Sequence, residues 1–158
     1  MKNILTPMIA LFLSLQLHAA LYTVKFIDKD GNEPNEHPWW DDQPICLIDC
    51  ADNSKIPDNN IKLAVGDQLI IQTPLNKRYG FGSYHHRCTI GNGSSYDVDR
   101  LTKVKVTNSN VKEEFTQFDF DALSSGTESF DIKFLDNSVN TSTTPGRLLG
   151  TVKVTITE

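Results

Sequence analysis

The feature of this sequence that most constrains its fold is a two-residue alternation of apolar and polar side chains. The alternation is clearest in FTQFDFDAL, ESFDIKFLD and TVKVTITE, whose alternate apolar positions are Phe118, Phe120, Phe130, Ile132, Phe134, Val152, Val154 and Ile156. Successive side chains of a β-strand point to opposite faces, so each segment is expected to form a strand with one buried face. The C-terminal part of the chain therefore predicts half-buried strands.

Other segments predict further strands. IKLAVGDQLIIQTP (61–74) indicates two strands joined at a Gly66-Asp67 turn, and LYTVKFID, GFGSYHHRCTI and LTKVKVT indicate one each. GNGSSYDVD is expected to be a loop, and no segment shows the period of a convincing amphipathic helix. About seven to eight short strands, bounded by Gly, Asn, Ser and Pro, predict an all-β sandwich.

The first twenty residues predict a segment outside the fold. MKNILTPMIALFLSLQLHAA has one Lys, an apolar run and a small-residue end at Ala19 and Ala20. These are the marks of a secretory signal peptide that is cut near residues 19–21. We therefore expect residues 1–20 to be a signal peptide and the product to be secreted or periplasmic, in a bacterium.

The remaining residues, 21–158, are expected to form a single domain, because their number is typical of one. Residues 21–60 are expected to be an irregular N-terminal extension with one strand. The prolines of KDGNEPNEHPWWDDQP (29–44) exclude a regular helix or a central strand there. Residues 61–158 are expected to be the core of the sandwich.

Composition and charge exclude several classes of function. The chain is 39% hydrophobic and 22% charged, as in ordinary globular domains, and its net charge is −5. An acidic chain lacks the basic footprint that nucleic-acid binding requires. No segment after the first twenty residues is apolar enough to span a bilayer. We expect no nucleic-acid partner and no membrane insertion.

The chain has three cysteines, Cys46, Cys50 and Cys88. Export to an oxidising compartment makes at least one disulfide the expectation. We prefer a Cys50–Cys88 bridge, which would tie the N-terminal segment to the sandwich and contribute about 4 kcal/mol for a loop of about forty residues. Cys46 is the alternative partner of either cysteine, because connectivity is not readable from sequence.

The stretch YGFGSYHHRC (79–88) raises the question of a metal or thiol site. On a strand, His86 and Cys88 share one face and His85 points to the other. A zinc site would need His86 and Cys88 together with the two other cysteines. A nucleophilic thiol would need an orienting group and an oxyanion pocket, which no residue pattern marks. We expect no metal, no cofactor and no enzymatic activity. A thiol- or metal-dependent protein is kept as a third hypothesis, after the two binding hypotheses given below.

Two groups of residues are candidates for partner binding. Trp39 and Trp40 lie in a loop-forming segment, and Trp is favoured both in binding hot spots and in buried caps of small domains. Lys77, Arg78 and Tyr79 are expected at a loop tip, where recognition residues concentrate on rigid sandwiches. Lys77, Arg78 and Tyr79 are the preferred binding residues, whereas Trp39 and Trp40 are expected first to cap the open end of the sandwich, with partner binding as the alternative.

The segment Leu63–Phe81, LAVGDQLIIQTPLNKRYGF, has a Val-Gly turn, an apolar strand, a Pro, and then Asn76, Gly80 and Phe81. It resembles the chagasin-type inhibitors of papain-like cysteine proteases, which carry Asn-Pro-Thr-Thr-Gly-Phe with the same spacing. The segments FDFDALSSGTESFDIKFL and GTVKVTI are similar to that family's last three strands. The resemblance covers about residues 61–158 and implies an immunoglobulin-like sandwich.

The sequence departs from the family in its loops. Lys77-Arg78-Tyr79 replaces Pro-Thr-Thr, the second loop near residues 110–114 has no glycine where the family has G-x-G-G, and Asp136-Asn137-Ser138 stands in place of Arg-Pro-Trp. Two of the three inhibitory loop motifs are therefore missing.

The resemblance implies a monomeric, non-enzymatic protein that binds a protein partner. The leading target is the cleft of a papain-like cysteine protease, blocked by Asn76–Phe81 with the loops near 110–114 and 136–147. The alternative is an adhesion or effector module that binds a host protein or glycan through Trp39, Trp40 and Tyr79.

Overall fold

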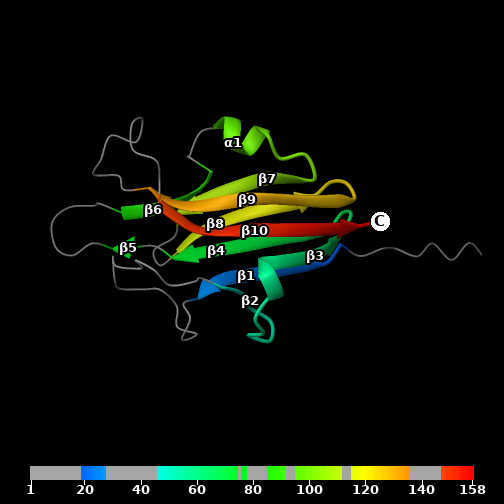
Figure 1. Cartoon of the computed structure of the whole chain (residues 1–158), viewed down its shortest axis with the longest axis horizontal. Helices are drawn as coiled ribbons and strands as arrows, with labels where there is room; N and C mark the ends of the chain where they lie inside the picture. The colour runs from blue at the N-terminus through cyan, green and yellow to red at the C-terminus, as the bar shows by residue number, and fades with distance from the viewer. Residues whose placement is uncertain are drawn as a thin grey trace, which may run out of the picture.

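The computed structural model describes residues 19–27, 46–74, 76–77, 85–91, 95–111, 115–135 and 147–158. Within these residues the chain is almost entirely β-structure, with one short α-helix, α1 (Ser95–Asp99), and one 3₁₀ turn, η1 (Pro57–Asn59) (Figure 1). The strands are β1 (Leu21–Ile27), β2 (Cys46–Asp49), β3 (Asn60–Ala64), β4 (Gln68–Pro74), β5 (Asn76–Lys77), β6 (His85–Ile90), β7 (Val104–Val111), β8 (Phe115–Ala122), β9 (Gly126–Leu135) and β10 (Arg147–Thr157).

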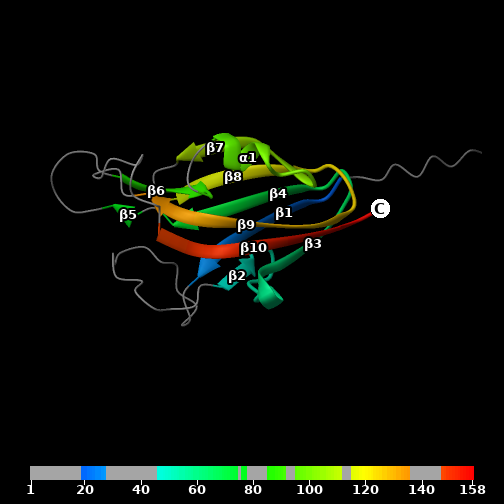
Figure 2. The same cartoon turned by 45° about the horizontal axis from the view of Figure 1, so that its top comes forward.

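The strands form two five-stranded sheets. The first sheet has the order β2-β1-β4-β8-β7, and the second has the order β3-β10-β9-β6-β5. Most neighbours are antiparallel, but β1 runs parallel to β4 and β3 runs parallel to β10. Figure 2 shows the two sheets stacked as layers. The predicted all-β sandwich is confirmed.

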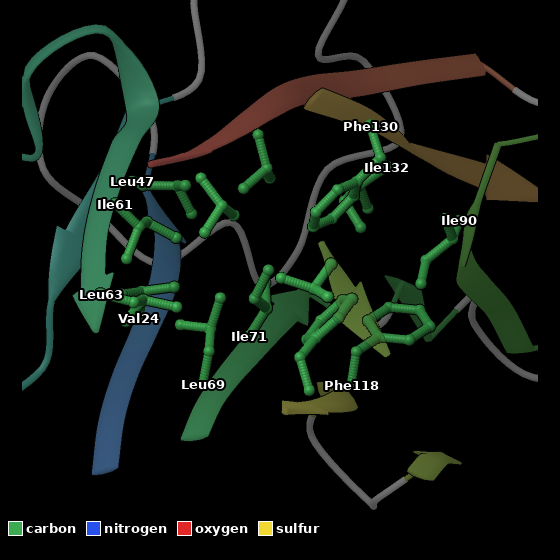
Figure 3. Close-up of a cluster of buried hydrophobic side chains, with 14 of the residues drawn as sticks. Val24, Leu47, Ile61, Leu63, Leu69, Ile71, Ile90, Phe118, Phe130 and Ile132 are labelled. Atoms are coloured by element: carbon green, nitrogen blue, oxygen red, sulfur yellow. The ribbon is translucent and has the colours of Figure 1, made fainter. Parts of the chain in front are cut away.

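The core lies between the sheets because the strands alternate as their sequences indicated. In β8 every second residue is buried, and Phe118 and Phe120 are 3% and 1% exposed. Phe120 stacks on Phe130 of the other sheet, with ring centroids 5.1 Å apart. Figure 3 shows apolar side chains from both sheets converging in this layer. Burying one such Phe side chain stabilises the fold by about 1.5–3 kcal/mol.

One end of the sandwich is closed by short turns, and we call it the turn end. The 65–67 turn joins β3 to β4 and so connects the two sheets. The amide of Val65 donates to the carbonyl of Thr157 at 2.9 Å, and the amide of Gly66 donates to the carbonyl of Ala122 at 2.9 Å. Gly66 has a φ of +91°, a conformation that L side chains rarely adopt.

The opposite end carries the other strand ends, and we call it the loop end. It is bordered in the first sheet by the end of β1, the start of β2, the end of β4 and the β7–β8 connection. In the second sheet it is bordered by the start of β6, the end of β9 and the start of β10. Figure 1 shows these strand ends on the side of the molecule away from the C-terminus.

The N-terminal segment differs from the expected irregular extension. It contains two strands, and β1 lies inside the first sheet between β2 and β4. Val24 and Phe26 of β1 are each 1% exposed and belong to the core. Local alternation could predict the strand but not its parallel pairing with β4, because that pairing joins segments far apart in the sequence.

Two further details differ from the sequence prediction. Ten strands are present in the described residues instead of about seven to eight, because β2 and the two-residue β5 add to those expected. The predicted loop after β6 contains α1, which is stabilised by packing of Val98 against the core. No helix within the described ranges is long and apolar enough to cross a membrane.

Candidate functional site

The loop end gathers the connections that the sequence analysis had assigned to binding. Segment 28–45 leaves β1 and returns to β2, whose end residues Ile27 and Cys46 are paired. Segment 112–114 joins β7 to β8, where Val111 pairs with Thr116. Segment 136–146 joins β9 to β10, where Phe134 pairs with Arg147. Each connection therefore begins and ends at the loop end.

The fourth connection, from β4 to β6, crosses from one sheet to the other. Pro74 pairs with Phe115 in the first sheet, and Asn76, two residues later, pairs with His86 of the second sheet. Lys77 pairs with His85. Asn76 and Lys77 thus form β5, a short strand at the edge of the second sheet. The chain that follows β5 returns to β6 at the same end of the sandwich.

The structure describes only part of the predicted binding residues. The backbones of Asn76 and Lys77 lie in β5, as given above. Arg78, Tyr79, Gly80 and Phe81 lie outside the described residues, and so do Trp39 and Trp40. Their assignment to partner binding stays a prediction. The strand pairings place the ends of the strands that precede and follow these residues.

The base of the loop end is a buried pair of threonines. Thr73 of β4 and Thr116 of β8 are directly paired, and each is 1% exposed. The Thr73 hydroxyl donates to the carbonyl oxygen of Thr116 at 3.0 Å. This contact ties the end of β4 to the start of β8, so the connections on either side leave from a fixed base.

The preferred Cys50–Cys88 bridge stays a prediction, because the side chain of Cys88 lies outside the described residues. Cys50 follows β2, and its amide donates to the carbonyl of Thr23 at 2.9 Å in the first sheet. Cys88 lies on β6 and pairs with Phe134 in the second sheet. Figures 1 and 2 show β2 beside β3, whereas β9 and β10 separate β6 from β3.

The other cysteine and histidine assignments remain predictions. The side chains of Cys46, Cys88, His85 and His86 lie outside the described residues, so bridges through Cys46 are untested. Among the side chains that are described, no group of three His, Cys, Asp or Glu residues is placed to hold a metal ion. The third hypothesis, a thiol- or metal-dependent protein, gains no support from these residues.

Among the described residues, the carboxyl group whose pKa is shifted is that of Asp52, which lies in a turn. Hydrogen bonds from the side chain and backbone of Ser54 lower the pKa of Asp52 below its ordinary value. The amide of Ser54 lies 2.8 Å from Oδ1 of Asp52, in the connection between β2 and η1. Asp52 is fully exposed. This is the geometry of a local turn, in which a short acidic side chain accepts from the backbone two residues on.

Sequence reasoning treated the Trp-containing segment as separate from the three family-like loops. The register changes this, because β1 and β2 place both ends of segment 28–45 at the loop end. The alternation in LYTVKFID indicated one strand in this region, and β2 in ICLIDC was not expected. The missing information was the pairing of β1 with β2 on one side and with β4 on the other, which no local pattern reveals.

Comparison with known proteins finds similar structures but no similar sequence. No protein-family model matches the sequence, and no curated protein shows significant sequence similarity to it. The structure is similar to a cysteine protease inhibitor from Entamoeba histolytica, with a TM-score of 0.46, 11% identity, and coverage of 89% of this chain and 98% of that chain. It is also similar to an inclusion body protein from Burkholderia cenocepacia, with a TM-score of 0.38, 13% identity, and coverage of 92% and 100%. Neither similarity decides the function.

Proposed function

We propose that this chain is an exported, monomeric, non-enzymatic binding protein whose loop end engages a protein partner. The observation that carries the proposal is the convergence of four connections at that end, given by the pairs Ile27–Cys46, Pro74–Phe115, Val111–Thr116 and Phe134–Arg147. A rigid sandwich that presents several adjacent connections is a common basis for protein recognition.

We propose a papain-like cysteine protease as the partner. The support is the resemblance of Leu63–Phe81 to the chagasin-type inhibitors, whose three adjacent loops fill a protease cleft. Specific interfaces bury about 800 Å² on each partner, more than one six-residue loop such as Asn76–Phe81 offers. The β7–β8 and β9–β10 connections would supply the additional contact area. Binding would block the cleft, and the inhibitor would take part in no covalent step.

A tight-binding titration tests this proposal. The exported protein is titrated into papain of known active-site concentration, and residual activity on a small peptide substrate is measured. The proposal predicts a linear fall of activity to zero at a ratio near one inhibitor per protease. Full activity in the presence of micromolar protein would overturn the assignment of a papain-like target.

A second candidate function has a specific observation in its favour. Because Ile27 pairs with Cys46, the segment that carries Trp39 and Trp40 begins and ends at the loop end. An adhesion or effector module would use these side chains and Tyr79 to bind a host protein or glycan. The intrinsic Trp fluorescence should then shift when the ligand is added. A Trp39→Ala, Trp40→Ala variant should lose that binding and leave protease inhibition unchanged.

A further inference from the structure

A buried carboxylate at the turn end receives the start of the folded chain. Asp67 is 6% exposed and lies in the turn between β3 and β4. Its Oδ2 accepts a hydrogen bond from the amide of Ala64 at 2.7 Å, and its Oδ1 accepts one from the amide of Ala20 at 2.8 Å. Its own carbonyl accepts from the amide of Ala122 at 2.9 Å. In the part of the chain that the structure describes, no cation forms an ion pair with this carboxylate.

Ala20 is held by hydrogen bonds at both its amide nitrogen and its carbonyl oxygen. Its nitrogen donates to Asp67, and its carbonyl accepts from the amide of Gln68 at 2.8 Å. Ala20 is partly buried, whereas Ala19 is exposed. The ordered contacts of the N-terminal strand therefore start at the nitrogen of Ala20. A buried charge without a cation is costly, and a charged donor in place of a neutral amide would strengthen the contact.

We propose that export cuts the chain between Ala19 and Ala20, and that the new α-ammonium of Ala20 pairs with Asp67. A signal peptidase would add water across the Ala19–Ala20 peptide bond. The Ala19 carbonyl carbon takes the oxygen and becomes the carboxylate of the released leader. The Ala20 nitrogen, protonated at neutral pH, becomes an ammonium group. The mature N-terminus is then part of the turn end. This inference depends on the export proposed above but not on the identity of the partner.

The structure distinguishes this cut from the neighbouring one. Sequence alone allows cleavage anywhere near residues 19–21. Cleavage after Ala20 would remove both the donor to Oδ1 of Asp67 and the acceptor for the amide of Gln68. It would leave a carboxylate that is almost wholly buried with one fewer partner. Cleavage after Ala19 retains both contacts and adds a full charge to one of them.

The position of the cut is measured first. The full chain is expressed with its own leader in a bacterial host, and the exported product is analysed by N-terminal sequencing and intact mass. The expected N-terminal residue is Ala20. An N-terminus at Leu21 or further along the chain would overturn the proposal.

The ion pair is measured by changing where the ammonium lies. Exported proteins starting at Ala19, Ala20 or Leu21 are compared by their thermal midpoints. The protein starting at Ala20 is expected to melt about 3–6 °C above the other two. In the form starting at Ala19, the neutral amide of Ala20 still donates to Asp67, but the α-ammonium group lies on the exposed Ala19. The comparison of this form with the Ala20 form therefore isolates the effect of the charge.

Substitution at the carboxylate completes the test. The Asp67→Asn variant should remove the difference between the forms that start at Ala19 and Ala20, because no charge remains to pair with. The Asp121→Asn variant is the matched control, since Asp121 lies at the same end and, among the described residues, its carboxylate accepts a single 3.3 Å contact, from the Gln68 side chain. It should leave the difference unchanged. If Asp67→Asn fails to fold, equal midpoints for the Ala19 and Ala20 forms of the unsubstituted protein would still contradict the ion pair.

Discussion

Thr73 and Thr116 face each other across β4 and β8 in nearly identical burial, yet their hydroxyl groups have different environments. The Thr73 hydroxyl donates to the Thr116 carbonyl at 3.0 Å. The Thr116 hydroxyl is buried and has no hydrogen-bond partner within the described structure. A buried polar group without a partner costs about 1–3 kcal/mol, whereas a satisfied one contributes about 1 kcal/mol. The two residues should therefore respond oppositely to the same substitution.

We predict that Thr116→Val raises the free energy of unfolding by about 1 kcal/mol and that Thr73→Val lowers it by about the same amount. Both substitutions keep the branched shape, so packing is matched. Urea denaturation of the two variants provides the measurement. A loss of stability in Thr116→Val equal to that in Thr73→Val would show that its hydroxyl has a partner in the protein.

Gly91, after β6, shows a second effect at the residue scale. It has a φ of +61°, and a Cβ added there would lie 2.6 Å from Cγ of Asp97 in α1. Gly66 has a φ of +91° but no atom within 4 Å of such a Cβ. We predict that Gly91→Ala costs about 2–4 kcal/mol and Gly66→Ala about 1–2 kcal/mol. Equal losses in the free energy of unfolding, measured by chemical denaturation, would mean that α1 moves away from the added methyl group without a free-energy cost.

Elements of the two sheets are joined by the carboxylate of Glu128. Glu128 lies on β9 of the second sheet and accepts from the amides of Thr102, Lys103 and Val104 at 2.8, 2.9 and 3.1 Å. Val104 is the first residue of β7 in the first sheet. One side chain thus fixes the start of an edge strand to the opposite layer at the turn end.

We predict that Glu128→Ala lowers the free energy of unfolding by about 2–4 kcal/mol, because three amides lose a charged acceptor. The matched control is Asp131→Ala on the same strand, whose carboxylate accepts one hydroxyl contact from Thr151 at 2.7 Å. The control should cost about 1 kcal/mol or less. Hydrogen exchange should also become faster at the amides of β7 in Glu128→Ala. Unchanged exchange there would contradict this role of Glu128.

At the element scale, the sequence predicted strands well and their partners poorly. Alternation in FDFDAL and TVKVTI predicts β8 and β10, because a strand with one buried face has an apolar residue at every second position. The partner of β1 is β4, more than forty residues away, and nothing local specifies that pairing. The α1 helix was missed because five residues carry too little periodicity, and its stability comes from packing of Val98 on the core.

The whole molecule has two unlike ends. The turn end is closed by short turns and by carboxylate contacts from Asp67 and Glu128. The loop end carries four connections, among them segments 28–45 and 136–146. The sequence could predict which segments would be connections, but not that the Trp-containing one shares an end with the others. That fact follows from the position of β1 in the sheet, which is a property of the whole fold.

The central claim is that the loop end binds a papain-like protease, and a pair of matched double variants tests it most directly. Arg78→Ala with Tyr79→Ala alters the connection after β5. Arg100→Ala with Tyr96→Ala removes the same two residue types from the α1 region, where the Arg100 guanidinium lies 4.2 Å from the Tyr96 ring centroid. Inhibition constants against papain are compared, with thermal midpoints as a check on folding. The account predicts a loss of at least tenfold in inhibition for the first variant and no change for the second. Equal inhibition by both folded variants would contradict it.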